Sequence, residues 1–131
     1  MIAYPLTIAA LLFGLAVYSW SGILVGRARS KYKVDAPATS GAPEFDRVFR
    51  AQMNTLEQLV LFVPLLMLAA ILWGDRAAAV YGLIWGLGRI LYVATYAKDA
   101  SKRSLGFALS AGTSMLVLIA LAVTLAMRAA G

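Results

Sequence analysis

The chain has 131 residues, of which 62% are hydrophobic, and a mean hydropathy of +0.80. Soluble domains contain about 45–50% apolar residues, so this composition predicts an integral membrane protein. The net charge of +6 is spread over the ends of apolar segments, and no nucleic-acid partner is expected. The absence of Cys and His excludes disulfides, a thiolate nucleophile of the chain's own and Cys-ligated metal, and it removes the usual general base. No metal site is expected.

Four long segments that carry almost no charge predict four transmembrane helices. Their expected bounds are Tyr4–Gly26, Phe45–Trp73, Ala77–Lys98 and Ser104–Arg128. The first segment lacks a preceding basic region and is longer than the apolar part of a signal peptide, so we expect it to be retained. The predicted fold is therefore an all-α bundle of four transmembrane helices in a single domain, residues 1–131.

The cations concentrate in two predicted loops, residues 27–44 and 98–103, whereas the loop between the second and third helices holds only Asp75 and Arg76. By the positive-inside rule the two basic loops are cytoplasmic and both termini face the opposite side. A bacterial inner membrane is the expected location. The stretch "DAPATSGAP", residues 35–43, predicts an irregular connection because it is rich in Pro, Gly and Ser.

Small residues and one proline predict how the helices pack. Pro64 is expected to bend the second helix. Small residues recur at a spacing that allows close helix contact, namely Gly22 with Gly26, Gly82 with Gly86, and Gly106 with Ser110 and Ser114.

A stripe of polar residues runs along the start of the second helix. Arg47, Arg50, Asn54 and Glu57 fall within an arc of roughly 80° at helical spacing. A charge at membrane depth costs at least about 2.5 kcal/mol, so such residues are expected to face a bundle interior or a wet cavity. A guanidinium, an amide and a carboxylate in one line suit a zwitterionic, amino-acid-like ligand.

Polar residues on and after the third helix are candidates to complete this site. Arg89 is the natural counter-ion for Glu57 or Asp46, and Tyr92 and Tyr96 share its helix face. The alternative is structural: Asp46, Arg47 and Arg89 would form ion pairs, and the tyrosines would anchor headgroups. Arg103, in "KDASKRS", either turns inward at this level or is an ordinary cytoplasmic cation.

The second helix also carries a recognisable motif. In "EFDRVFRAQMNTLE", the pattern E-R-x-x-R-A-x-x-N-x-x-E is filled by Asp46, Arg47, Arg50, Ala51, Asn54 and Glu57, with Asp in place of the first Glu. The sequence therefore resembles the MAPEG family, the membrane-associated proteins in eicosanoid and glutathione metabolism. The stretches "APATSGAPEF" and "GRILYVATYAKDASKRS" are similar to its leukotriene C synthase branch, so that the resemblance covers residues 27–104.

The resemblance implies a homotrimer of four-helix subunits that binds glutathione, the thiol co-substrate, between neighbouring subunits. Arg103 matches the arginine thought to hold the thiol as a thiolate. Gln52 lies off the polar stripe, which fits a site shared across a subunit interface. The positions that match glutathione-binding residues are Arg29, Arg50, Gln52, Asn54, Glu57, Tyr92 and Tyr96.

Three positions depart from the synthase pattern. Gln58 stands where that branch has a Tyr that helps to hold glutathione, and Ser30 replaces a second basic residue beside Arg29, which weakens the case for leukotriene synthesis. Ser104 follows Arg103, as in the prostaglandin E synthase branch, where this Ser has been proposed to activate the thiol. Its alternative role is the N-cap of the fourth helix.

The predicted function is a membrane-bound glutathione transferase, with peroxidase activity also open, acting on hydrophobic electrophiles from the bilayer. Its expected partners are copies of the same chain, membrane lipid and a hydrophobic small molecule. Tight substrate specificity is not expected, because no polar groups outside the glutathione constellation could recognise a lipid. The alternative is a non-enzymatic, lipid-binding or lipid-presenting member of the family. A four-helix multidrug exporter is disfavoured, because residues 4–26 contain no ionisable carboxylate or cation.

Overall fold

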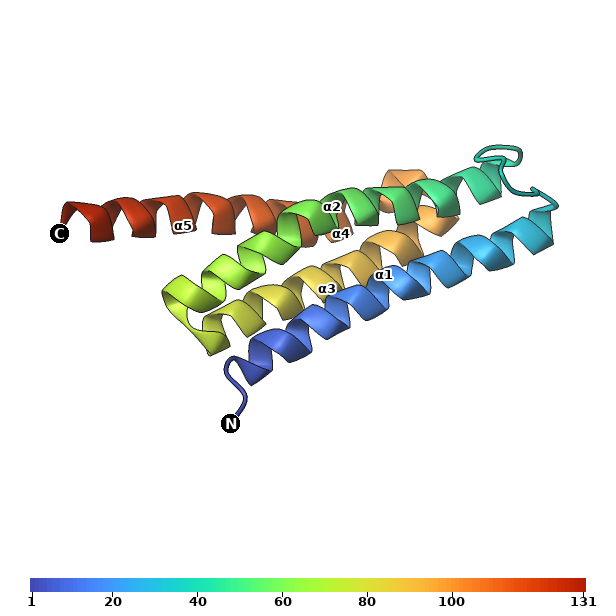
Figure 1. Ribbon diagram of the computed structural model, residues 1–131. Coiled ribbons are helices and arrows are strands. Elements are labelled where there is room, and N and C mark those ends of the chain that lie inside the picture. The colour runs from blue at the N-terminus through green and yellow to red at the C-terminus, as the bar shows by residue number, and fades with distance from the viewer.

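The computed structural model describes residues 1–131, and every regular element is helical (Figure 1). In chain order the elements are α1 (Pro5–Tyr32), α2 (Pro43–Trp73), α3 (Asp75–Lys98), the 3-10 helix η1 (Ala100–Lys102), α4 (Ser104–Phe107), the π-helical segment η2 (Ala108–Gly112) and α5 (Thr113–Ala130). Because α4, η2 and α5 follow one another directly, they form one fourth helix. All 4 helices are long and apolar enough to cross a membrane, and the predicted four-helix fold is confirmed.

The first helix is longer than predicted. It was expected to end at Gly26 but continues to Tyr32, and the chain turns only at Lys33, where φ is 57°. Hydropathy marks the apolar part of a helix and not its end, and no proline or glycine interrupts residues 27–32. Arg27, Arg29 and Lys31 therefore lie on α1, and the expected loop over residues 27–44 is wrong in its first part.

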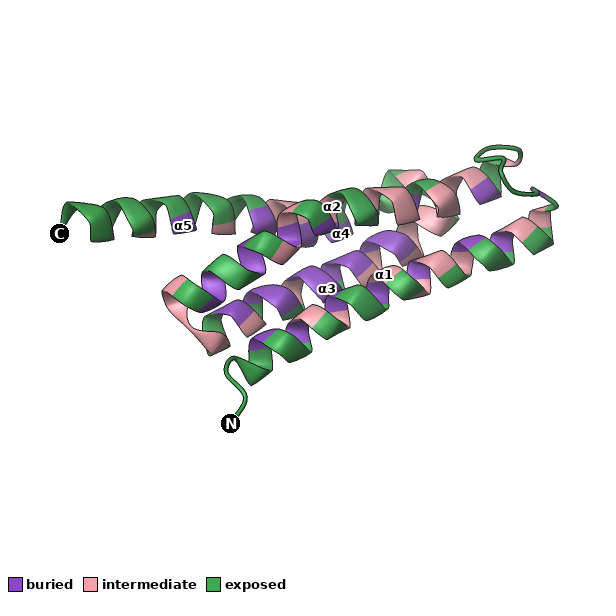
Figure 2. Cartoon of the chain, viewed as in Figure 1, coloured by how far each residue is buried: buried purple, intermediate pink, exposed green.

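Three helices, α1, α2 and α3, pack on one another and form the core. Half of the apolar span of α3 is buried, more than in any other helix. The ring of Phe62 stacks on Trp85 with 4.0 Å between centroids, and Tyr81 meets Phe62 edge-on at 5.4 Å. Figure 2 shows the buried residues on the facing sides of these helices, with exposed residues outside. The exposed side chains include many large apolar ones, as expected for contact with lipid.

The small residues do allow close contact at most of the predicted positions. A Cβ added at Gly82 would lie 2.6 Å from the Cβ of Ala10, and one at Gly106 would meet the backbone of Tyr92. Gly26 is an exception, because it faces open space within the chain. The other predicted small residues on α3 and the fourth helix are also buried: Gly86, Ser110 and Ser114.

Polar contacts tie the helix ends together. The carboxylate of Asp75, the first residue of α3, accepts hydrogen bonds from the N–H groups of Leu6 and Thr7 at 3.1 and 2.7 Å and from the Thr7 hydroxyl at 2.8 Å. These are otherwise unpaired donors in the first turn of α1, so Asp75 caps a helix other than its own. At the other end of the bundle, Asp46 accepts from the Ser40 hydroxyl and the Gly41 N–H and holds the α1–α2 connection.

The fourth helix packs closely only in its first part. Figure 1 shows α5 running away from α3 toward the end where both termini lie. Its outer part is tied to the end of α2, because Trp73 Nε1 donates to Thr124 Oγ1 at 3.0 Å and Arg128 donates to the Leu72 carbonyl at 2.6 Å. Figure 1 also shows that α2 bends along its length, as expected from Pro64, the proline inside the helix.

Candidate functional site

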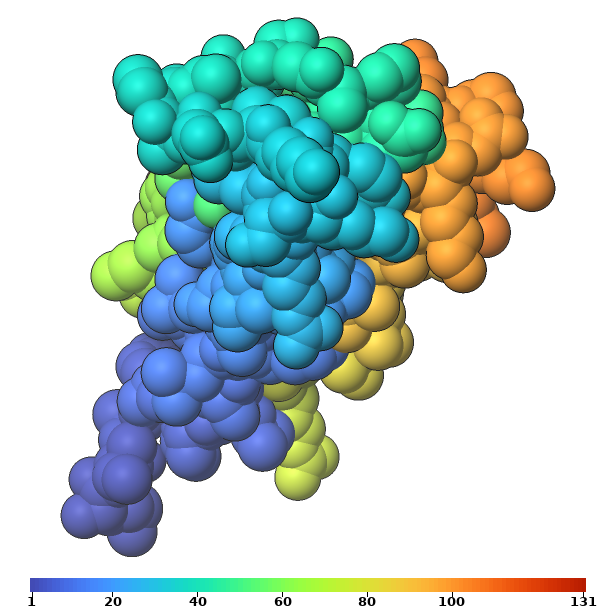
Figure 3. All heavy atoms as spheres, turned by 90° about the vertical axis from the view of Figure 1, so that its right-hand side faces the viewer, coloured from blue at the N-terminus to red at the C-terminus, as the bar shows by residue number.

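The largest cavity, of about 560 Å³, lies between α2 and the α3–α4 corner, near the end of the bundle opposite the termini. This volume is within the range of about 300–1,000 Å³ that small-molecule sites occupy. Figure 3 looks at this end, where the first turns of α2 lie beside the segment around η1. The lining residues are Arg50, Asn54, Tyr92, Tyr96, Arg103, Ser104 and Phe107. Of these, Phe107 alone was not among the predicted site residues.

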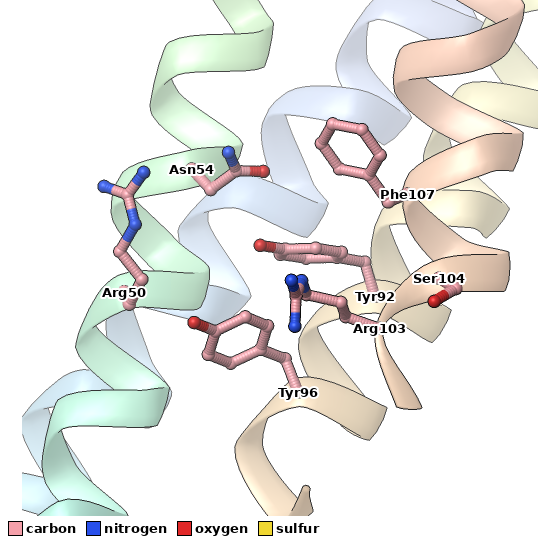
Figure 4. A pocket seen from close by; sticks show the side chains of 7 residues that line it. All are labelled: Arg50, Asn54, Tyr92, Tyr96, Arg103, Ser104 and Phe107. Carbon is pink, nitrogen blue, oxygen red and sulfur yellow. The ribbon is translucent and has the colours of Figure 1, made fainter. Parts of the chain in front are cut away.

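Two tyrosines one turn apart on α3 form the floor of the cavity. Their ring centroids are 5.4 Å apart, and Figure 4 shows both hydroxyls pointing toward the side of α2 that carries Arg50 and Asn54. The ring of Tyr92 also lies 6.1 Å from that of Phe107 on α4. The spacing of Tyr92 and Tyr96 thus places two phenol hydroxyls beside the polar stripe of α2.

Arg103 reaches the cavity from the short turn after α3. Its guanidinium lies 5.9 Å from the Tyr96 ring centroid and donates to the Ala100 carbonyl at 2.8 Å. The turn is held by Asp99, whose carboxylate accepts from the Ser101 hydroxyl at 2.7 Å and from the Ser101 N–H at 3.0 Å. These bonds lower the pKa of Asp99, so it is ionised at neutral pH. The hydrogen bonds within "KDASKR" therefore hold the turn and orient the Arg103 side chain toward the cavity.

The polar stripe on α2 is a connected group of side chains. Arg50 donates to both carboxylate oxygens of Glu57, at 2.9 and 3.3 Å, and Asn54 Nδ2 donates to Glu57 Oε2 at 3.2 Å. In Figure 4 the guanidinium of Arg50 points away from the tyrosines. The Arg50 and Glu57 side chains are 53% and 49% exposed, so this pair lies open on the outer face of α2.

The predicted pairing of Arg89 with Glu57 or Asp46 is wrong. Arg89 is fully buried and its guanidinium contacts neutral groups only. Asp46, in the first turn of α2, accepts hydrogen bonds from the α1–α2 connection, and Glu57 is already paired with Arg50. Helical spacing identified the correct faces, but it could not show that Asn54 lies between Arg89 and Glu57.

Arg47 also has a structural contact. Its Nε donates to the carbonyl of Ala97 at 3.3 Å, close to the C-terminal end of α3. A cation at this end complements the partial negative charge of the helix terminus. Asp46 binds the α1–α2 connection and Arg47 binds the end of α3, so these two residues of α2 join elements beside the cavity without lining it.

Three predicted ligand residues do not line the cavity of their own chain: Glu57, which is paired with Arg50 on the outer face of α2, Arg29 and Gln52. Arg29 donates to the carbonyls of Val34 and Ala38, at 3.3 and 2.7 Å, and lies over the Phe45 ring. Gln52 faces α1, because a Cβ added at Gly22 would lie 3.2 Å from its Nε2.

Ser104 lines the cavity, whereas Gln58 does not. The expected capping role of Ser104 is wrong, because Arg103 is the N-cap of α4 and Ser104 makes no capping hydrogen bond. The hydroxyl of Ser104 instead lines the cavity. Gln58, the replacement for a tyrosine, has a buried Oε1 without a partner and does not line the cavity.

Sequence reasoning missed three residues around the site. Phe107 lies one turn after Arg103, so its helical spacing could have placed it on the cavity wall. Thr55 and Ser110 bind the guanidinium of Arg89, and neither residue type carries a signal for this role. Ser110 was predicted only as a small packing residue.

The chain matches known proteins over most of its length. The model of the MAPEG family matches residues 6–127. An uncharacterized protein of Synechocystis sp. is 52% identical over 97 residues, which are 74% of this chain and 71% of that protein. Human microsomal glutathione S-transferase 2 is 45% identical over 94 residues, 72% of this chain and 64% of the relative. Bovine leukotriene C4 synthase is 37% identical over 92 residues, 70% of this chain and 61% of the relative. The match thus spans slightly less than two thirds of the two mammalian proteins.

Proposed function

Because the chain belongs to the MAPEG family, we propose that it is a membrane-bound glutathione transferase. Family membership and four apolar helices make it an integral, multi-pass membrane protein. Its relatives include proteins named glutathione S-transferase and leukotriene C4 synthase, which supports a glutathione-related enzyme. The observation that carries the proposal is the cavity that Arg50, Asn54, Arg103 and two tyrosines line.

The charges around this cavity fit glutathione, which has two carboxylates, one ammonium and a thiol. Arg50 and Arg103 can bind carboxylates or a thiolate, and Glu57, the one carboxylate of the stripe, can bind the ammonium. Arg50 forms a two-point pair with Glu57 in the chain, and a guanidinium offers the same fork to a ligand carboxylate. In this proposal the zwitterionic end of glutathione binds at the Arg50–Glu57 pair.

Arg103 is proposed to activate the thiol. A free thiol has a pKa of about 8.5, and a neighbouring guanidinium lowers this value by stabilising the thiolate. Arg103 is held toward the cavity by the Ala100 carbonyl, and its neighbour Ser104 offers a hydroxyl to the same space. The chain has no Cys or His, so the thiol comes from the co-substrate and its proton leaves to water.

The sulfur would then attack a hydrophobic electrophile. A bond forms between sulfur and the electrophilic carbon, and the electron pair moves to the leaving group or to an oxygen of the opened ring. Phe107 and the exposed apolar faces of α4 and α5 provide the wall for such a substrate, which reaches the site from the bilayer. An apolar wall of this kind selects for hydrophobicity and approximate shape.

The proposal includes a homotrimer in which each site is shared. Arg29 and Gln52 match ligand-binding positions of the family, yet their side chains lie away from the cavity of their own chain. A neighbouring subunit that supplies them would explain this separation. We also propose a bacterial inner membrane, with the basic segments around residues 27–44 and 98–103 in the cytoplasm and the termini opposite.

The test is stopped-flow ultraviolet absorbance of the thiolate, with purified protein mixed with glutathione and with Arg103→Ala as the control. We expect a saturable thiolate signal in the natural chain that is absent in the variant, followed by conjugation of a hydrophobic electrophile. Conjugation without consumption of hydroperoxides would separate transferase from peroxidase activity. No thiolate signal and no glutathione binding by calorimetry would contradict the proposal and favour the lipid-binding alternative.

A further inference from the structure

Arg89 is the only fully buried charged side chain, and no carboxylate touches it. Its NH2 group donates to Asn54 Oδ1 and to Thr55 Oγ1, both at 2.9 Å, and its NH1 group donates to Ser110 Oγ at 3.2 Å. Its Nε has no partner. The guanidinium also lies 4.0 Å from the centroid of the Tyr92 ring. A buried cation surrounded by neutral groups is costly to maintain, so its contacts need an explanation beyond packing.

One of these contacts decides how Asn54 is oriented. A guanidinium has five N–H donors and no acceptor, whereas the amide of asparagine has one accepting and one donating end. Asn54 must therefore turn its oxygen toward Arg89. Its nitrogen then points the other way, where it donates to Glu57 Oε2 at 3.2 Å.

We propose that Arg89 is a positioning residue that locks the Asn54 amide, so that the ligand site meets only its donor end. Asn54 lines the cavity, and its Nδ2 makes a single hydrogen bond within the chain. The second amide hydrogen is then available to an acceptor in the cavity, such as a ligand carboxylate. The first hydrogen holds Glu57 in its two-point contact with Arg50.

The same lock places the buried cation near a carboxylate without direct contact. Arg89, Asn54, Glu57 and Arg50 form a continuous chain of hydrogen bonds from the interior to the outer face of α2. Each amide end matches the charge that it meets, since the oxygen faces a cation and the nitrogen faces an anion. A reversed amide would present an oxygen to the Glu57 carboxylate and a nitrogen to the guanidinium, which is unfavourable at both ends.

Asn54→Asp tests the lock because the new side chain has the same shape but no donor. A carboxylate at this position still accepts from Arg89 and neutralises it, so the thermal midpoint of the purified protein should stay the same or rise. It also faces the Glu57 carboxylate and any ligand carboxylate, so glutathione affinity measured by calorimetry should fall at least tenfold. A role limited to structure would not move stability and affinity in opposite directions.

Ser110→Ala is the matched control. It removes a different partner of the same guanidinium, on the side of Arg89 that faces the fourth helix and not the cavity. We expect its thermal midpoint to fall while glutathione affinity stays within twofold of the natural chain. If Asn54→Asp lowers stability as much as Ser110→Ala does, or binds glutathione normally, the proposal is wrong.

A second pair of variants tests Arg89 itself. Arg89→Lys keeps a side chain that only donates, whereas Arg89→Met keeps an apolar stem without a donor. We expect Arg89→Lys to retain more glutathione affinity than Arg89→Met, with KM changing more than kcat in both. The reverse order, or equal losses that follow stability, would overturn the proposal.

The affinity measurements rest on the proposed function, but the stability measurements do not. If the natural chain binds no glutathione, the proposed function fails. A thermal midpoint for Asn54→Asp that stays above that of Ser110→Ala would still support the proposed role of Arg89. A thermal midpoint as low as that of Ser110→Ala would reject it.

Discussion

At the scale of single residues, the proposed function divides the site into groups that would bind the ligand and a group that would act on its thiol. Arg50 and Glu57 lie on α2 and bind each other, whereas Arg103 is held by the turn after α3 and faces Tyr96. In the proposed function, Arg50 and Glu57 bind the charged groups of the ligand, whereas Arg103 stabilises its thiolate. Removal of a binding group and removal of a thiolate partner should therefore have different kinetic signatures.

Arg103→Ala should lower kcat by about 100-fold with a small change in KM, because the anion that it stabilises forms only after binding. Arg50→Ala and Glu57→Ala should instead raise KM for glutathione by about tenfold or more, as expected for the loss of a hydrogen bond between charged groups. Steady-state kinetics with one hydrophobic electrophile would measure both. Equal changes in kcat and KM for all three variants would contradict the assigned roles.

Residue spacing predicted the contacts within α2 better than those between helices. The positions of Arg50, Asn54 and Glu57 on one face followed from helical geometry alone, and their side chains do touch. The partner of Arg89 did not follow, because it depends on how α2 and α3 are rotated against each other. A buried arginine usually pairs with a carboxylate, but three neutral oxygen atoms accept the hydrogen bonds of Arg89 instead.

At the scale of elements, the fourth helix fixes the cavity through one close contact. Gly106 on α4 lies against the backbone of Tyr92, and the next residue in the chain, Phe107, lines the cavity. The π-helical segment η2 comes directly after, and Ser110 within it donates to the Gly106 carbonyl at 2.8 Å. The spacing between α3 and α4 therefore depends on a residue without a side chain.

Gly106→Ala should destabilise the protein by about 1–3 kcal/mol, because the added methyl group meets a backbone that cannot rotate away. Glutathione affinity should fall as well, since Tyr92 would have to move. Thermal unfolding and calorimetry would measure the two effects. Gly26→Ala is the control: it meets nothing within 4 Å and should be neutral or stabilising. Similar losses in both variants would argue against the close contact.

Sequence patterns located the helices but not their irregular parts. Apolar length identified all four spans, since lipid requires an unbroken hydrogen-bonded helix. The same signal could not find the end of α1, because the basic residues after Gly26 are good helix formers. The π-helical turn in the fourth helix also left no trace, because "ALSAG" is compatible with an ordinary helix.

At the scale of the whole molecule, the single chain leaves much apolar surface and an open cavity. The α5 helix touches mainly α2, and its outer face is exposed (Figure 2). Arg29 and Gln52 point away from the cavity that their family positions suggest. A trimer with shared sites would account for both features and can be tested without a structure.

Co-expression of an Arg29→Ala chain with an Arg103→Ala chain should restore part of the transferase activity that each variant lacks alone. In a shared site, one subunit supplies Arg29 and its neighbour supplies Arg103, so some interfaces in a mixed trimer contain both. The measurement is specific activity of purified mixed complexes. If each site lies within one chain, every site keeps a defect and activity does not recover.

The proposed orientation can be measured by cysteine labelling, because the natural chain contains no Cys and gives no background. Thr39→Cys lies in the exposed α1–α2 connection, and Ala77→Cys is exposed at the opposite end. A membrane-impermeant maleimide should label Ala77→Cys in intact cells and Thr39→Cys only after permeabilisation. The opposite pattern would reverse the orientation.

The contact between Arg50 and Glu57 has a further consequence for a protein surrounded by lipid. Fatty acids and anionic headgroups are abundant competitors for any exposed guanidinium in a bilayer. A competitor that carries only a negative charge would have to separate Arg50 from Glu57 and leave that carboxylate without a cation. A zwitterionic molecule can pair its carboxylate with Arg50 and its ammonium with Glu57, so that neither side chain loses an oppositely charged partner. The Arg50–Glu57 pair therefore favours ligands that carry both charges over the simple anions of the bilayer.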